Sequence, residues 1–127
     1  MAAFNERDAE PFIAIADPEV EWHSLFAEVG GVYKGHDGLR RFEGDLDDVW
    51  GDIRLEPEAF FDLGEHTLAF NVVRGRGKES GAEVAMPNAV VMQWRDGLCV
   101  YGKVYANRED ALRDLGISGD ALDPIAP

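Results

Sequence analysis

Three histidines are the residues of this chain best suited to acid–base chemistry. An imidazole titrates near neutral pH and can therefore take up or release a proton during a reaction. We expect His36 to help begin a helix and His66 to be exposed after a turn, which leaves His23 as the candidate acid or base. However, His23 follows Trp22 in an alternating segment, so an inward Trp22 would turn His23 outward.

Three tyrosines are candidates for donating a hydrogen bond to an oxygen of a bound molecule: Tyr33, Tyr101 and Tyr105. In the segment that ends at Tyr105, alternation puts Tyr101, Lys103 and Tyr105 on one face of a strand. A lysine between two tyrosines is unusual for a face buried in a core. We expect this face either to line a hydrated pocket or to form the surface of a dimer, and the sequence leaves both alternatives open.

Asn88 is the residue that we expect to orient a ligand. It shares a strand face with the apolar residues at alternate positions from Met86 to Trp94. A single amide on an otherwise apolar face is typical of a small-molecule site. The alternative is that Asn88 bonds to backbone groups that Pro87 leaves unpaired, and the sequence does not separate the two roles.

Large apolar side chains could line or support a ligand cavity, or could simply fill the core. These side chains are Trp22, Phe26, Trp50, Phe70, Met92 and Trp94. The predicted ligand site consists of Trp22, Phe26, Tyr33, Trp50, Phe70, Asn88, Met92, Tyr101 and Tyr105, with His23 as the catalytic candidate.

Neither a metal site nor a cofactor is expected. Cys99 is the only cysteine and lies in the apolar run LCVYGKVY, which is typical of a buried structural thiol. The histidines do not follow the spacing of zinc ligands. The segment RGRGKESG (74–81) lacks the strand–loop–helix setting of a phosphate-binding loop, so we interpret it as a solvated hairpin.

The elements that must position these residues follow from hydrophobic periodicity and turn signals. Helices are predicted over 1–16, 37–50 and 107–116, and strands over 17–24, 52–64, 66–77, 82–97 and 98–105. Asp96-Gly97 is a hairpin signal, while Asn107 and Gly116 are typical of the two ends of a helix. Because helices come first and strands then follow one another, the order predicts an α+β fold.

Composition limits the class of protein and its partners. A chain of 127 residues suits one domain, which we place at 1–116 with a loose tail over 117–127. The net charge of -13 argues against a nucleic-acid partner and against an anionic membrane surface. No apolar run is long enough to cross a bilayer, and the first residues do not resemble a signal peptide, so we expect a cytoplasmic protein.

Four segments stand out in order along the chain: FNERD (4–8), DPEVEWHS (17–24), YKGHDGLRRF (33–42) and WRDGLCVYGKVYANREDAL (94–112). Together they resemble the nuclear transport factor 2-like superfamily, in particular its SnoaL-like (polyketide cyclase-like) branch. The resemblance implies a cone-shaped roll, in which a curved, mainly antiparallel sheet wraps around N-terminal helices over an apolar pocket. It also implies a homodimer, and a first helix that is shortened in this chain.

The catalytic members of this superfamily are informative by contrast. Where a ketosteroid isomerase places its aspartate base, this chain has the segment around His23, which is why His23 is our candidate. The tyrosine of the first helix would fall at or before Met1, and the segment NAVVMQW (88–94) carries no carboxylate. The residues of the isomerase are therefore not matched, and neither are the paired aspartates and arginine of an epoxide hydrolase.

The sequence favours a small pocket protein that binds a small hydrophobic molecule. The first alternative is an enzyme of the isomerase, cyclase or dehydratase type, in which His23 moves a proton while a tyrosine or Asn88 polarises a carbonyl. The second alternative is a non-catalytic dimeric scaffold. Fold alone does not decide among them, because this superfamily includes both catalytic and non-catalytic proteins.

Overall fold

The computed structural model describes residues 10–24, 32–77 and 80–117, and for residues 46–52 it describes the backbone alone. The elements are α2 (Glu10–Ile13), β1 (Ala16–His23), β2 (Tyr33–Lys34), α4 (Gly35–Val49), β3 (Trp50–Asp62), β4 (His66–Gly77), β5 (Glu83–Arg95), β6 (Leu98–Tyr105) and α5 (Arg108–Leu115). Most of the predicted loose tail and the first nine residues lie outside these ranges. The strands predicted over 66–77 and 98–105 are confirmed with the same bounds.

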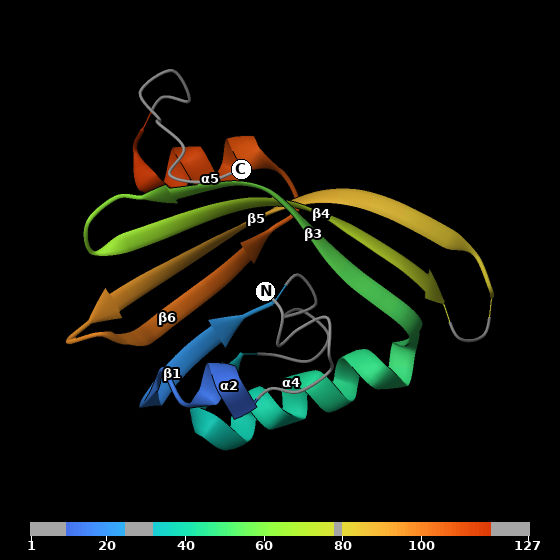
Figure 1. Ribbon diagram of the computed structural model, residues 1–127, viewed down its shortest axis with the longest axis horizontal. Coiled ribbons are helices and arrows are strands. Elements are labelled where there is room, and N and C mark those ends of the chain that lie inside the picture. Colours follow the sequence, from blue (N-terminus) through green and yellow to red (C-terminus); the bar gives the residue numbers. More distant parts are fainter. Residues whose placement is uncertain (1–9, 25–31, 78–79, 118–127) are drawn as a thin grey trace.

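The six strands form a single sheet in the order β2-β1-β6-β5-β4-β3. Strands β3 to β6 make an antiparallel meander, whereas β1 joins β6 in parallel. Figure 1 shows the sheet curving over α4, which lies below it in that view. The α+β fold with a curved, mainly antiparallel sheet is therefore confirmed.

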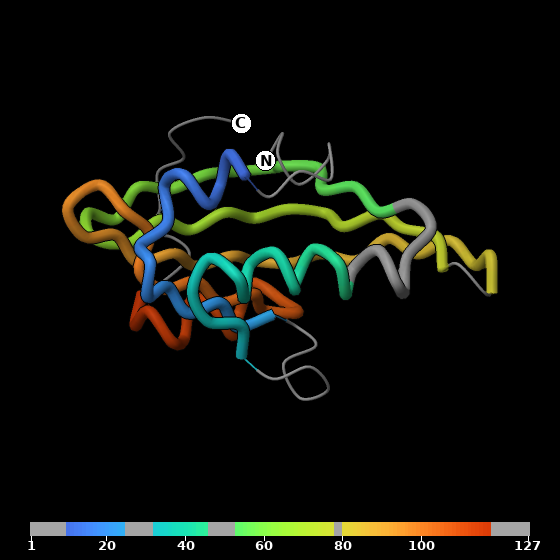
Figure 2. Tube along the Cα trace, turned by 90° about the horizontal axis from the view of Figure 1, so that it is seen from below, coloured from blue at the N-terminus to red at the C-terminus, as the bar shows by residue number. Residues whose placement is uncertain are grey.

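The helices cover the two faces of the sheet differently. In Figure 1, α2 and α4 lie below the sheet and α5 lies above it. Figure 2, seen from below, has α2 and α4 nearer the viewer than β3 and β4. We call the side toward α2 and α4 the inner face and the side toward α5 the outer face.

Each face has its own apolar packing. On the inner face, one cluster includes Val20, Trp22 and Val90, and a second consists of Ile53, Leu55 and Val73; Phe42 of α4 packs against both. On the outer face, a third cluster joins strands β3, β4 and β5 to α5. Its buried members are Phe61, Leu68, Phe70, Ala89, Val91 and Ala111.

The predicted turn and cap signals are confirmed. Asp96 and Gly97 both have positive φ, 53° and 79°, as the tight hairpin between β5 and β6 requires. The side chain of Asn107 accepts a hydrogen bond from the Asp110 N–H at 2.8 Å and so caps the start of α5. Gly116 ends that helix in the left-handed conformation, with φ of 69°.

Strand β3, predicted over 52–64, does not alternate regularly. Regular alternation would put Ile53, Leu55, Pro57, Ala59 and Phe61 on one face. The pairing with β4 instead shifts between Pro57 and Ala59, and such a bulge turns the following residues to the other face. As a result, Ile53 and Leu55 pack on the inner face while Phe61 packs on the outer face with Ala59 against it.

Pro87 sits in β5 without disturbing the pairing with β4, in which it lies opposite Val72. On its other side β5 pairs with β6, and that ladder stops at Ala89 and Tyr105. Pro87 therefore lies where the strand has a neighbour on one side only. This is the edge position that a proline tolerates, because its missing N–H costs no ladder bond there.

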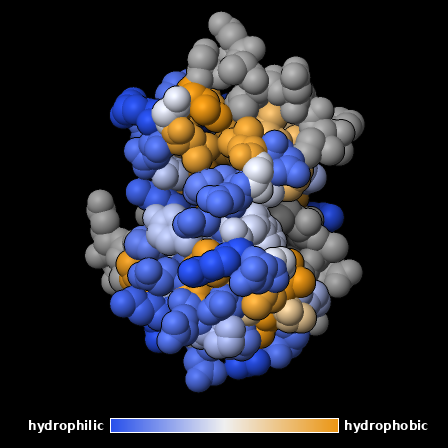
Figure 3. All heavy atoms as spheres, turned by 90° about the vertical axis from the view of Figure 1, so that its left-hand side faces the viewer, coloured by the Kyte–Doolittle hydropathy of each residue, from blue (hydrophilic) through white to orange (hydrophobic). Residues whose placement is uncertain are grey.

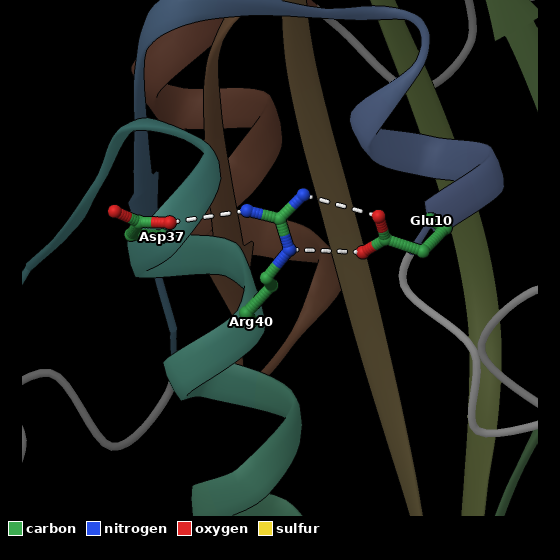
Figure 4. Close-up of polar contacts among 3 residues, drawn as sticks. All are labelled: Glu10, Asp37 and Arg40. Atoms are coloured by element: carbon green, nitrogen blue, oxygen red, sulfur yellow. Dashed lines mark hydrogen bonds and ion pairs between the residues drawn. The ribbon is translucent and has the colours of Figure 1, made fainter.

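A bidentate ion pair between Arg40 and Glu10 joins α4 to α2 (Figure 4). The guanidinium of Arg40 binds both carboxylate oxygens of Glu10, each at 3.0 Å, and also an oxygen of Asp37 at 3.0 Å. Arg40 and Glu10 are about half exposed, so solvent screens the attraction. The pair orients the short helix α2 and adds little to stability.

Large apolar side chains are sparse on the surface. Those of the described residues that are well exposed are Ile15, Phe60 and Met86. Figure 3, a view of one end of the molecule, shows small hydrophobic groups separated by hydrophilic ones. No helix in the described ranges is long and apolar enough to span a membrane.

Candidate functional site

Two asparagine side chains meet on the inner face of the sheet. Asn71 of β4 and Asn88 of β5 lie directly opposite each other in the antiparallel register, and directly opposite residues point to the same face. Asn71 Nδ2 donates a hydrogen bond to Asn88 Oδ1 at 3.1 Å. Both amides are buried, with 0% and 5% of their surface exposed. The structure thus gives Asn88 a side-chain partner on the neighbouring strand.

The surroundings of this amide pair are apolar. Two residues further along β4 lies Val73, and two residues further along β5 lies Val90, so both share the face of the amides. Val73 and Val90 belong to the two inner clusters, and Phe42 of α4 packs against both clusters. The Asn71–Asn88 pair therefore lies on the sheet between two apolar clusters that share an aromatic ring.

One oxygen of this pair lacks a hydrogen bond. Among the buried side-chain atoms of the described residues, Asn71 Oδ1 and Trp22 Nε1 have no hydrogen-bond partner. A buried polar group without a partner costs about 1–3 kcal/mol, and native proteins keep few of them. Asn71 Oδ1 is thus an acceptor, held among apolar side chains, that is not used within the described part of the chain.

Trp22 forms the aromatic centre of the inner face. Its ring lies 5.8 Å from the ring of Phe12 and 5.8 Å from that of Phe42, measured between centroids. Room for the indole comes from Gly102 on β6, because a Cβ at this position would come within 2.4 Å of the indole ring. Trp22 points inward, as one of the two alternatives for β1 predicts.

Tyr33 lies in the same inner cluster, but its hydroxyl is already used. The hydroxyl donates to Asp45 of α4 at 2.6 Å, and the ring packs 5.2 Å from Phe42. Burial, and then the hydrogen bond to the Asp45 carboxylate, raise the pKa of Tyr33 to about 12. The phenol stays protonated at neutral pH and ties β2 to α4.

Met92 and Trp94 are partly buried on β5 and pack against the inner cluster. The indole N–H of Trp94 donates to Thr67 Oγ1 at 3.0 Å. Trp94 therefore has its polar atom satisfied, in contrast to Trp22. Trp22, Asn88 and Met92 are the predicted site residues that the structure brings together on the face of the amide pair, with Tyr33 packed in the same cluster.

His23 lies on the outer face. It follows the inward Trp22 along β1, and its ring packs 4.9 Å from that of Tyr101 on β6. Tyr101 is partly exposed, and burial together with the nearby Glu21 carboxylate raises its pKa. The structure thus separates His23 and Tyr101 from Asn88 by the thickness of the sheet.

Tyr105 and Phe70 are also on the outer face. Tyr105 donates to Asp114 of α5 at 2.7 Å, and burial followed by this hydrogen bond raises its pKa. The Lys103 ammonium lies 4.9 Å from the centre of the Tyr105 ring and 3.8 Å from the Asp114 carboxylate. Phe70 is buried under α5, with the guanidinium of Arg108 4.7 Å from its ring centre.

The remaining candidate residues either make structural contacts or lie outside the residues that the structure describes. His36 Nε2 donates to the Ala16 carbonyl at 2.9 Å and ties the start of α4 to β1. Cys99 is fully buried, and burial raises the pKa of its thiol to about 11. Phe26 lies outside the described residues, as does the side chain of Trp50. Within the described ranges no three metal-binding side chains come together.

The sequence interpretation missed Asn71, Phe12 and Phe42 as site residues. The signal for Asn71 was present, because it sits with Ala69 and Val73 at an apolar-face position of its own predicted strand. A lone amide in each of two consecutive antiparallel strands suggests a cross-strand pair. The register that brings the two amides together depends on the length of the intervening loop, which alternation does not reveal.

Comparison with known structures shows the same fold. A protein described as NTF2-like and of unknown function, from Burkholderia pseudomallei K96243, has 22% sequence identity and a TM-score of 0.76, with 88% of each chain covered. TerC, co-crystallised with polyporic acid, has 24% identity and a TM-score of 0.75, with 90% of this chain and 89% of that chain covered. A putative polyketide cyclase from Pseudomonas putida KT2440 has 20% identity and a TM-score of 0.69, with 88% and 89% covered.

Sequence comparison leads to the same family. No curated protein matches the chain significantly. The family model described as SnoaL-like domain matches residues 1–102, a range that includes β1 to β5, most of β6 and both asparagines of the inner face. The resemblance found in the ordered segments is therefore confirmed, and the chain belongs to the SnoaL-like family of the NTF2-like fold.

Proposed function

We propose that the inner face of the sheet binds a small, largely apolar molecule that carries a polar group, and that Asn71 and Asn88 orient this group. The observation that carries the proposal is the buried amide pair with its unpartnered Asn71 Oδ1. A few convergent polar atoms within an apolar lining are what a small-molecule site uses to fix orientation.

The aromatic residues around the pair support this chemistry. Phe42 packs against the clusters on both sides of the amides, and Trp22 adds a large flat surface next to it. Removing the apolar surface of a ligand from water against these rings contributes about 25 cal/mol per Å². Two solved structures of the same fold also support a small-molecule site, since one was co-crystallised with polyporic acid and the other is a putative polyketide cyclase.

Binding is favoured over proton transfer at this face. A general acid or base must ionise and must reach the reacting atoms, but the residues beside the amides on the same face are Ala69, Val73, Met86 and Val90. His23, the predicted acid or base, packs against Tyr101 on the outer face. An isomerase or dehydratase reaction through His23 would therefore need a substrate on the other side of the sheet.

Isothermal titration calorimetry and thermal unfolding with polyporic acid, 2-naphthol and 4-phenylphenol test the proposal. We expect at least one of these probes to bind and to raise the melting temperature by roughly 10 °C at 100 times its Kd, because such occupancy adds about 2.7 kcal/mol. Asn88→Leu removes the acceptor that holds the Asn71 amide in place, and it should weaken binding about tenfold, the value of one hydrogen bond of about 1.4 kcal/mol.

Ser80→Ala is the matched control, since Ser80 is exposed in the loop before β5 and its replacement should leave affinity unchanged. Saturation by none of the three probes at millimolar concentration would contradict the proposal. Equal weakening by Asn88→Leu and Ser80→Ala would remove the assigned role of the amides.

We further propose a homodimer that forms through the outer face, where the partly exposed rings of His23 and Tyr101 pack together. Partly exposed aromatic groups of this kind are enriched at interfaces. Sedimentation should show a dimer at micromolar concentration, and Tyr101→Glu should convert it to a monomer by burying a charge. A wild-type monomer under these conditions would contradict this proposal without affecting the ligand site.

A further inference from the structure

The hydrogen-bonding capacity of the amide pair defines what a ligand has to offer. An asparagine amide has two N–H donors and one oxygen that accepts. Asn71 uses a donor toward Asn88 Oδ1, while its own oxygen has no partner among the described residues and is completely buried. The vacant function at Asn71 Oδ1 is therefore an acceptor, and a donor group on a ligand can satisfy it.

The apolar surroundings also select the charge of the donor. Beside the amides on the same face, Ala69 and Val73 follow on β4 and Met86 and Val90 follow on β5, so no carboxylate is adjacent along either strand. An ammonium brought to this place would lose its hydration without gaining an opposite charge from these two strands, which is far more costly than burying a neutral hydroxyl. A neutral donor fits these surroundings.

We infer that the ligand presents a neutral hydroxyl, such as a phenol, an enol or an alcohol, to Asn71 Oδ1. This inference rests on the proposed function, because it specifies the polar group of the molecule bound at the inner face. It distinguishes hydroxylated aromatic molecules from their ethers, from ketones without a hydroxyl, and from amines that are protonated at neutral pH.

The test compares three probes with the same two-ring body by isothermal titration calorimetry: 2-naphthol, 2-methoxynaphthalene and 2-naphthylmethylamine, which is a cation at pH 7. We expect wild type to bind 2-naphthol roughly 5- to 100-fold more tightly than the methyl ether, which corresponds to one buried acceptor gaining or losing its partner. The cationic amine should bind more weakly than the ether.

Asn71→Leu keeps the size of the side chain and removes the acceptor. In this variant the preference for 2-naphthol over the ether should fall to about twofold or less. The reason is that 2-naphthol loses its hydrogen bond to the acceptor, whereas the ether never made one. Circular dichroism and the melting temperature establish that the variant is folded, and Asn71→Ser provides a second variant that retains an oxygen. If neither variant folds, the ratio of the two affinities in wild type still decides the inference.

The outcomes separate the inference from the proposed function. Equal affinity for 2-naphthol and its methyl ether would overturn the inference while leaving a small-molecule site in place. Tightest binding of the cationic amine would overturn it as well and would indicate an anionic group near the amides. If 2-naphthol, its ether, 4-phenylphenol and polyporic acid all fail to bind, the inference and the proposed function fall together.

Discussion

Gly102 of β6 lies beneath the indole ring of Trp22 on β1, so close that a Cβ at this glycine would stand 2.4 Å from the ring atoms Cε3 and Cζ3. The two residues are also register partners in the parallel pairing of β1 with β6. The glycine therefore allows the bulky indole of Trp22 to lie against the neighbouring strand.

Gly102→Ala should destabilise the protein, because the methyl group would displace the Trp22 ring from its packing against Phe12 and Phe42. Overpacking of this kind costs roughly 1–3 kcal/mol, which urea unfolding followed by circular dichroism can measure. Gly44→Ala is the matched control: Gly44 lies in α4 with no heavy atom within 4 Å of its Cβ position, so alanine should stabilise by up to about 1 kcal/mol. Equal effects of the two substitutions would contradict the assigned role of Gly102.

The double substitution Asn71→Leu with Asn88→Leu should leave the unliganded protein at least as stable as wild type. Replacing both members of a buried polar pair by apolar groups of similar shape removes the unmet acceptor along with the hydrogen bond, and such exchanges are often neutral or stabilising. Urea unfolding and probe binding, measured on the same variant, should show retained stability and lost preference for 2-naphthol. A loss of more than about 2 kcal/mol would instead show that the pair serves stability.

The carboxyl group of Glu10 should report the pairing with Arg40. The hydrogen bond from Arg40 holds the pKa of Glu10 below its ordinary value of 4.5, and Arg40→Met should return it toward that value in an NMR titration. Because the folded pKa is lowered, the contribution of the pair is present above the ordinary pKa and is lost as the pH falls through the folded pKa. Lys103→Met, far from α2 on the outer face, should leave the Glu10 titration unchanged.

All three tyrosines of the chain should resist ionisation. Burial is the largest cause in each case, and it raises the pKa of Tyr33 to about 12 and those of Tyr101 and Tyr105 above the ordinary value of 10.0. Because the folded values are raised, their contribution to stability is complete below pH 10 and is lost as the pH rises through the folded values. Absorbance at 295 nm should therefore stay nearly flat at pH 10, where a free phenol is half ionised.

Urea-unfolded protein is the reference for this tyrosine titration, and its absorbance should rise with a midpoint near pH 10. Tyr33→Phe should remove the step that Tyr33 contributes near pH 12. A folded protein that loses a tyrosine proton with a midpoint near pH 10 would contradict the buried placement of these hydroxyl groups.

Local signals predicted much of the fold. The stretch from His66 to Gly77 contains an apolar run bounded by turn residues, and the hairpin at Asp96-Gly97 needs positive φ at both residues, so these strands could be placed from residue types alone. Helix α5 was equally clear, because Asn107 and Gly116 have distinct physical roles at its two ends. These features depend on residues that are close together in the sequence.

What could not be predicted depends on contacts between distant segments. The bulge after Pro57 decides that Phe61 faces α5, and the proline alone could not predict it, because proline in a strand signals an edge position as well as a bulge. The face of Tyr101 and Tyr105 was identified as shared, but whether it lay toward α4 or toward α5 depended on where the helices pack. The partner of Asn88 also remained hidden, since only the register of β4 with β5 brings Asn71 opposite to it.

The parallel pairing of β1 with β6 has a consequence for the order of folding. Trp22 and Gly102 are about 80 residues apart along the chain, and contacts of such long range form slowly, since a large loop must close first. During synthesis β2 can pair with β1 early, but the β6 neighbour that packs against the indole of Trp22 is missing until nearly the whole domain has left the ribosome. Strand β1 therefore cannot complete its pairing until β6 has been made. Until β6 pairs with β1, the apolar inner face stays exposed to water and to other unfinished chains.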